Sequence, residues 1–306
     1  MQLKQKNAIA LLITLLFIIA ITASIGIGLK QVNKASKEIE KEKFMIQANV
    51  TIEDVLKILQ NSPELDMIVE EKSAISLFTF LSQTSFLPFE SSGAQIILEI
   101  NSARSKFNPN LILESNSTIN EPINQSLREY LSNNNINLAL VDIMIDVMGG
   151  IKEDLVYNSD IFYEKPELYR DRLASREHFR EIQDFYESSY HENSLKNINF
   201  NNLFLYSNTK DMKIDLNYAT AEVWELILGI DKLRAQEILQ GAIPYEKLED
   251  LGLQDDEKEK LNRFKTSFFE PYLDIKIEVI QDDKIAKIRF EYDLVNKKGT
   301  NFSYDI

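Results

Sequence analysis

The sequence predicts an α+β fold, with a long N-terminal helix beside a small antiparallel sheet and a large all-α domain inserted into that sheet. Three observations predict it. An apolar run of about 22 residues lies near the N-terminus at 8–29. Strand-like alternation occurs at 94–100 and returns from 274 to the end, and the roughly 160 residues between them are mostly helical in pattern.

Composition limits the function classes. The chain has 306 residues, and its 48 acidic residues against 34 basic ones give a net charge of -14. An acidic chain lacks the overall positive charge of a protein that binds nucleic acid or an anionic membrane surface. The chain contains no cysteine, which excludes disulfides, thiol nucleophiles and thiolate metal sites.

The run at 8–29 contains no charged side chain. As a helix it spans about 33 Å, which matches a hydrocarbon core of about 30 Å. Three interpretations compete: a cleaved secretory signal, a plain membrane anchor, and a prepilin-type leader. In the third, a short stub containing Lys4 and Lys6 is removed and the apolar helix is retained.

Helix-forming sequence continues past the apolar run. Residues 30–42 contain neither glycine nor proline, and 50–60 has apolar residues at helical spacing, so one face packs on another element. Asn61, Ser62 and Pro63 end this helix. The segment 73–87 is ambiguous between strand and helix, and 94–100 is predicted as a strand.

The middle of the chain reads as short helices. They are expected around 125–131, at 138–148 before Gly149 and Gly150, after Ser175, and as a pair within 215–240 joined at Gly229. The acidic residues of 246–259 predict a solvent-exposed helical face. Trp224 is expected in a hydrophobic core. Strands follow at 274–280 and 284–294 around a turn at 281–283, with a third at 301–306.

Five segments in one order carry a family resemblance: 6–16, 97–112, 138–157, 213–230 and 244–251. The matching residues are Phe107, Asn108, Asn110, Asp142, Asp146, Glu153, Tyr157, Asn217, Ala219, Glu222, Val223, Pro244 and Tyr245. Together these segments resemble the type II secretion minor pseudopilin K (general secretion pathway protein K) family.

The resemblance implies a pilin-like fold in five parts. These are a leader at 1–8, a transmembrane helix at 9–29, a stem with the first part of the sheet at 30–104, an inserted helical domain at 105–270 containing a SAM-like or helix-hairpin-helix unit, and closing strands at 271–306. It implies a single-pass protein of the bacterial inner membrane whose C-terminal domain lies in the periplasm.

The implied function is structural. The family caps the pseudopilus together with minor pseudopilins I and J and initiates its assembly for export of folded proteins. Other implied partners are the major pseudopilin, the inner-membrane assembly platform and the prepilin peptidase. A helical insert on the head would also clash with any subunit stacked above it, which favours a position at the tip.

Processing departs from the usual pattern because no glycine precedes the cleavage point. Cleavage between Ala8 and Ile9 is the first choice, and cleavage between Asn7 and Ala8 is the second. Methylation of the new N-terminus is implied. Most pilin-like subunits have a glutamate as the fifth residue after the cut. This chain has none there, and the absence of this glutamate is characteristic of the family it resembles.

Three alternatives remain open. A type IV pilus minor pilin would share the architecture, and an adhesin would share the membrane tether. The segment 215–240 also resembles a helix-hairpin-helix of DNA-uptake receptors, which bind phosphate through a Gly-x-Gly turn. Here Asp231 replaces the second glycine, so no nucleic-acid binding is expected.

Asp142 and Asp146 lie four residues apart and share a helix face. They are either metal ligands, paired acids or anchors for a helix end and loop. The family resemblance implies bound calcium, with Glu153 as a third candidate, although no ligand set is assigned. The two histidines, His178 and His191, lack zinc-ligand spacing, and no nucleophile elbow or phosphate loop occurs, so enzymatic activity is not expected.

Overall fold

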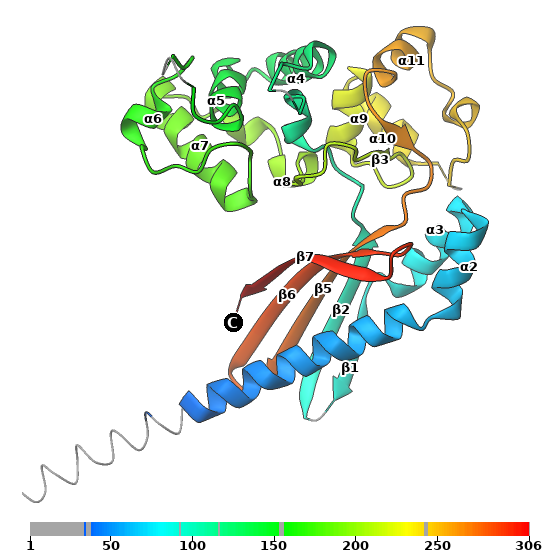
Figure 1. Cartoon of the computed structure of the whole chain (residues 1–306). Coiled ribbons are helices and arrows are strands. Elements are labelled where there is room, and N and C mark those ends of the chain that lie inside the picture. Colours follow the sequence, from blue (N-terminus) through cyan, green and yellow to red (C-terminus); the bar gives the residue numbers. More distant parts are fainter. Residues whose placement is uncertain are drawn as a thin grey trace, which may run out of the picture.

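The computed structural model describes residues 34, 38–91, 93–115, 117–152, 156–241 and 244–305. They form a helix-and-sheet part and a helical part (Figure 1). The expected leader at 1–8 and span at 9–29 lie outside the described residues. Within the described ranges, no helix is long and apolar enough to cross a membrane.

A helix at residues 38–60 forms the stem of the molecule. One side of it is apolar and buried against the sheet, through Phe44, Ala48, Ile52, Val55 and Leu59. These residues recur every three or four positions, so they share one helix face. The face predicted from the periodicity at 50–60 therefore packs against the sheet.

Two short helices follow the stem, α2 (Pro63–Glu71) and α3 (Ala74–Thr84). Each begins at a serine whose side chain accepts a hydrogen bond from a backbone N–H of the first turn, Ser62 for α2 and Ser73 for α3. The ambiguous segment 73–87 is thus mostly helical. Helical spacing buries its Ala74, Leu77 and Leu81 on one side, and the strand begins only at Leu87.

The sheet has five antiparallel strands in the order β1-β2-β5-β6-β7. Their bounds are β1 Leu87–Ser91, β2 Ala94–Ser102, β5 Tyr272–Gln281, β6 Lys284–Asp293 and β7 Lys298–Asp305. The alternation predicted for β2, β5 and β6 is confirmed, since alternate residues of these strands are buried. The third closing strand is longer than expected and begins at Lys298 rather than 301.

The helical part lies between β2 and β5 in the chain. Its elements are η1 Pro109–Ile112, α4 Glu121–Asn133, α5 Ala139–Met148, α6 Ile161–Glu164, α7 Arg176–Tyr190, η2 Ser194–Asn197, α8 Phe200–Leu203, β3 Ile214–Asp215, α9 Ala221–Leu228, α10 Lys232–Leu239, η3 Leu248–Leu251, α11 Asp255–Leu261 and β4 Thr266–Ser267. The two-residue strands β3 and β4 pair in parallel.

Two separate hydrophobic clusters hold the molecule together. One joins the stem, α2, α3 and the five-stranded sheet, and the other fills the helical part. The second cluster contains Trp224, which is fully buried as expected. The division means that the helical part has its own core and does not depend on the sheet for its apolar packing.

Two local expectations need correction. The acidic segment 246–259 is not simply a solvated face, because Glu257 is buried and paired with Arg234 of α10. After α5, only Gly150 has a positive φ, of 71°, while Gly149 keeps right-handed helical geometry. One glycine in the left-handed region suffices to turn the chain at this helix end.

Candidate functional site

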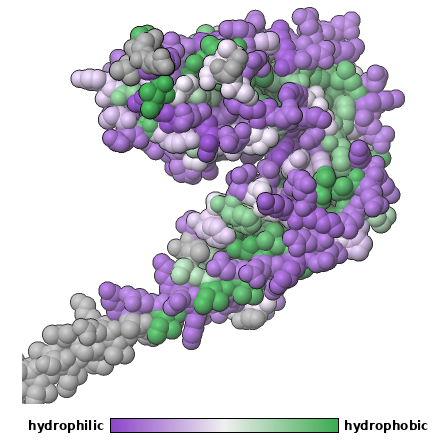
Figure 2. Space-filling model, in the orientation of Figure 1, coloured by the Kyte–Doolittle hydropathy of each residue, from purple (hydrophilic) through white to green (hydrophobic). Residues whose placement is uncertain are grey.

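The stem carries a second apolar stripe on the side away from the sheet. Ile39, Ile46 and Val50 are spaced seven and four residues apart, so they share a face. They are 53%, 57% and 49% exposed. At about 100° per residue, Ile46 and Val50 lie nearly opposite the buried Ala48. Figure 2 shows hydrophobic side chains exposed along this region.

Exposed aliphatic side chains on one face of a helix are suited to contact with another apolar helix. The same region carries an ion pair that joins the stem to its own sheet, Lys284 with Glu40 at 3.5 Å. The stem can therefore be held by the sheet on one side while it presents apolar side chains on the other. The stripe of Ile39, Ile46 and Val50 is called the outer stripe below.

The junction between the two parts is built around Arg104, which follows β2. Its guanidinium donates to both carboxylate oxygens of Glu291 on β6, at 2.7 and 2.8 Å. It also lies 3.8 Å from the ring centre of Tyr272, the first residue of β5. The Arg104 side chain is only 5% exposed. One buried side chain thus ties the start of the insert to two strands of the sheet.

A second junction group is Asp215 of β3, which is fully buried. Its carboxylate accepts hydrogen bonds from the backbone N–H groups of Asn217 and Glu270, at 3.0 and 2.9 Å. Its own backbone N–H donates to the carbonyl oxygen of Arg104. The segments through which the chain enters and leaves the insert therefore meet at one residue, Asp215.

Burial raises the pKa of the Asp215 carboxyl from 3.8 to about 7. The hydrogen bonds from the backbone N–H groups of Asn217 and Glu270 act in the opposite direction and lower this pKa. A folded pKa above the unfolded one means that the protonated acid stabilises the fold. This stabilisation is fully present below about pH 4 and is lost as the pH rises through about 7.

We expect Asp215→Asn to remove the part of the pH dependence of stability that comes from the Asp215 carboxyl. Relative to the variant, the natural chain should lose about 2 to 4 kcal/mol of unfolding free energy between pH 4 and pH 8. Urea unfolding at several pH values on a soluble fragment beginning at residue 38 measures the difference. A difference between the two chains that stays constant with pH would contradict the prediction.

Two asparagines matched in the family resemblance, the buried Asn110 and the half-buried Asn217, link distant backbone segments within the insert. The side chain of Asn110 exchanges hydrogen bonds with the backbone of Leu173 and donates to the carbonyl of Ser207. Asn217 exchanges hydrogen bonds with the backbone of Tyr245 and donates to the carbonyl of Phe268. These motif residues hold loops together, because each satisfies backbone groups from distant segments.

The two described candidate metal residues, Asp142 and Asp146, have different partners. Asp142 pairs with Arg128 of α4. Asp146 is fully buried and accepts hydrogen bonds from the backbone and side chains of Asn158 and Ser159, at 2.8 to 3.0 Å, with Lys152 at 3.4 Å. Glu153 lies outside the described residues, and those that are described form no cluster of three or more potential metal ligands.

This geometry fits the loop-anchor interpretation of Asp146, since its carboxylate holds the loop after α5 in place. Bound calcium stays a prediction. The processing residues Asn7, Ala8 and Ile9 also lie outside the described residues, so their part as a cleavage site stays a prediction.

The hairpin that resembles a DNA-binding motif is formed by α9 and α10, with Gly229 at φ 60° between them. Asp231 is the N-cap of α10, and its carboxylate accepts the backbone N–H of Arg234 at 2.9 Å. A negative charge already occupies the helix end where a phosphate would bind. The hairpin also packs through the buried Val223, Ile227 and Ala235. The absence of nucleic-acid binding stays a prediction.

Sequence reasoning missed Arg104 and Asp215 as junction residues. The partners of Arg104 are 168 and 187 positions further along the chain, at Tyr272 and Glu291 (272 − 104 and 291 − 104). The only available signal was an arginine placed directly after a predicted strand. That position does not identify its partner.

The described elements define an α+β fold. A helical stem lies along a five-stranded antiparallel sheet, and a helical domain is inserted between two strands of that sheet. No protein-family profile matches the chain, and no curated protein matches it significantly in sequence.

Among solved structures, the chain is similar to one chain of the crystal structure of the GspK–GspI–GspJ complex from the enterotoxigenic Escherichia coli type 2 secretion system. The match has a TM-score of 0.52 at 12% identity and covers 85% of this chain and 99% of that one. The resemblance to the minor pseudopilin K family inferred from the sequence is thus confirmed at the level of the fold.

Proposed function

We propose that this protein is a minor pseudopilin of a bacterial type II secretion system. It forms the tip of the pseudopilus with minor pseudopilins I and J, and it initiates assembly for export of folded proteins. The observation that carries this proposal is the insertion of a whole helical domain between two neighbouring strands of a stem-and-sheet head, in a chain whose overall fold is similar to that of a chain of the GspK–GspI–GspJ complex.

The position of the insert favours a terminal subunit. The chain leaves the sheet at Ser102, enters it again at Tyr272, and pairs Ser102 with Leu273. Both connections therefore lie at one end of the sheet, with the helical part beyond them and the first residues of the stem at the far end (Figure 1). A subunit added above this end would meet the helical part instead of a flat head.

The outer stripe supplies the contact with sibling subunits. Burying three exposed aliphatic side chains against a neighbouring stem removes apolar surface from water, which favours side-by-side packing. The sheet-facing stripe is already occupied within the chain. The outer stripe is therefore the part of the stem on which minor pseudopilins I and J and the major pseudopilin would pack.

Membrane insertion and processing belong to the same proposal. Residues 9–29 cross the inner membrane once, the described part lies in the periplasm, and the prepilin peptidase removes residues 1–8 before the assembly platform takes up the subunit. These steps rest on the charge-free apolar run and its basic stub.

The outer stripe can be tested with a matched pair of variants. The full chain is expressed with minor pseudopilins I and J of the same bacterium and captured from detergent extract. Ile46→Glu should lower the captured I and J at least about tenfold, because a carboxylate would be buried without a partner. Ile75→Glu on α3, at a residue 46% exposed, should leave capture unchanged.

Equal capture by both variants, or no capture of I and J by the natural chain, would contradict the proposal. Mass spectrometry of the captured chain provides an independent measurement. Removal of seven or eight residues with N-methylation is the expected result, and an intact stub or cleavage after Ala23 is the contrary one.

A further inference from the structure

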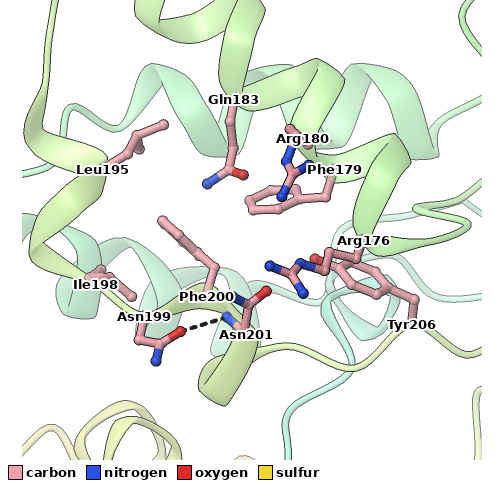
Figure 3. Close-up of a pocket in the computed structure, with 10 residues that line it drawn as sticks. All are labelled: Arg176, Phe179, Arg180, Gln183, Leu195, Ile198, Asn199, Phe200, Asn201 and Tyr206. Atoms are coloured by element: carbon pink, nitrogen blue, oxygen red, sulfur yellow. Dashed lines mark hydrogen bonds between the residues drawn. The ribbon is translucent and has the colours of Figure 1, made fainter. Parts of the chain in front are cut away.

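A polar cavity of about 170 Å³ lies between α7 and the segment that follows it, η2 and α8. Figure 3 shows the guanidinium groups of Arg176 and Arg180 and the amide of Gln183 pointing toward its centre. Phe200 and Tyr206 lie beside them. The cavity is lined mainly by hydrogen-bond donors; of its aromatic residues, Phe179 and Phe200 are buried and Tyr206 is partly exposed.

The charge of this cavity is opposite to that of the protein. The chain has a net charge of -14, yet no aspartate or glutamate lines the cavity. Arg176 and Arg180 are four residues apart on α7 and therefore lie on one face of the helix. Two positive charges thus point into one hollow of an acidic surface.

These two arginines differ from the other seven of the chain. Each of the others contacts a carboxylate, an aromatic ring or a hydroxyl: Arg104 with Glu291, Arg128 with Asp142, Arg170 with Tyr157 and Phe162, Arg172 with Tyr169, Arg234 with Glu257, Arg263 with Ser126 and Arg289 with Asp274. Across the described ranges, neither Arg176 nor Arg180 forms an ion pair or hydrogen bond through its guanidinium.

The neighbouring Glu177 interacts electrostatically with both arginines but is not among the residues that line the cavity. Its pKa is lowered mainly by its own backbone N–H and by the Ser175 hydroxyl, and less by Arg176 and Arg180. Its charge is therefore held at the start of α7.

We propose that this cavity binds the carboxylate of an acidic peptide segment from a partner protein. The planar guanidinium groups hold the two carboxylate oxygens, and the amides of Gln183 and Asn201 supply further donors. The partly exposed ring of Tyr206 contacts an apolar side chain next to the acidic one. This ring favours a peptide over a free inorganic anion, and the inference does not depend on the proposed function.

Calorimetric titration of the full chain in detergent tests the proposal with two probes, acetyl-Leu-Glu-Leu-amide and acetyl-Leu-Gln-Leu-amide. The glutamate peptide should bind at least about tenfold more tightly than the glutamine peptide. Arg176→Gln and Arg180→Gln should each weaken its binding about tenfold. Lys196→Gln removes the same charge from an exposed residue outside the cavity and should change affinity less than about twofold.

Phenylglyoxal labelling gives a second readout that does not need variants. The glutamate peptide should protect Arg176 and Arg180 from modification, while Arg172 reacts at an unchanged rate. Equal binding of the two peptides, an equal loss with Lys196→Gln, or displacement of the peptide by an equal concentration of inorganic phosphate would each overturn the proposal.

Discussion

Replacing Arg104 with alanine should destabilise the folded chain by about 3 to 5 kcal/mol. The Glu291 carboxylate, whose side chain is only 20% exposed, would lose both of its hydrogen bonds to the guanidinium. The ring of Tyr272 would lose its cation contact as well. Urea unfolding of a fragment beginning at residue 38, followed by circular dichroism, measures the change.

Lys276→Ala is the matched control for this variant. Lys276 of β5 also pairs with a carboxylate, that of Glu99 at 3.0 Å, but the two side chains are 46% and 40% exposed. Water replaces a lost exposed pair, so we expect a loss of only about 1 kcal/mol or less. Similar effects of the two variants would show that burial of the Arg104 pair adds nothing to its stabilising effect.

Asp146→Ala should destabilise the helical part by about 3 to 5 kcal/mol. The backbone N–H groups of Asn158 and Ser159 would lose their acceptor, and the ammonium group of Lys152 would lose its counter-ion. Trp224 is the only tryptophan and lies in the core of the helical part, so its fluorescence reports the unfolding of that part.

Asp142→Ala is the control, one helical turn earlier on α5. Asp142 is 41% exposed in its pair with Arg128, so its loss should change stability by about 0.5 to 1 kcal/mol. The same comparison with added calcium tests the metal prediction. Stabilisation of the natural chain by calcium that disappears in Asp146→Ala would support a ligand role for Asp146, and an equal response of both chains would argue against it.

The strands could be predicted where burial is one-sided. In β2, β5 and β6, buried residues alternate with more exposed ones. The sequence shows the same alternation of apolar and polar residues, so these strands could be predicted from it. The segment 73–87 could not be assigned, because phenylalanine and β-branched residues suit either conformation. Packing decided it: α3 buries Ala74, Leu77 and Leu81 on one side and contacts β2.

The candidate site was predictable in part. Spacing placed Asp142 and Asp146 on one helix face, but it did not distinguish a metal site from anchors. Their partners come from other segments, α4 for Asp142 and the loop at 158–159 for Asp146. The outer stripe could not be identified from the sequence either. Apolar residues at helical spacing give the same pattern whether their helix face is buried within the chain or exposed to solvent.

The sequence by itself determined the order of most local elements and the sheet-facing side of the stem, because these depend on the periodicity of neighbouring residues. Only the tertiary structure decided which charges are paired and buried. Arg104 meets Glu291, and Arg176 and Arg180 meet no carboxylate in the described part of the chain. The physical reason is that an ion pair depends on distance in space, and folding brings together groups that are far apart along the chain.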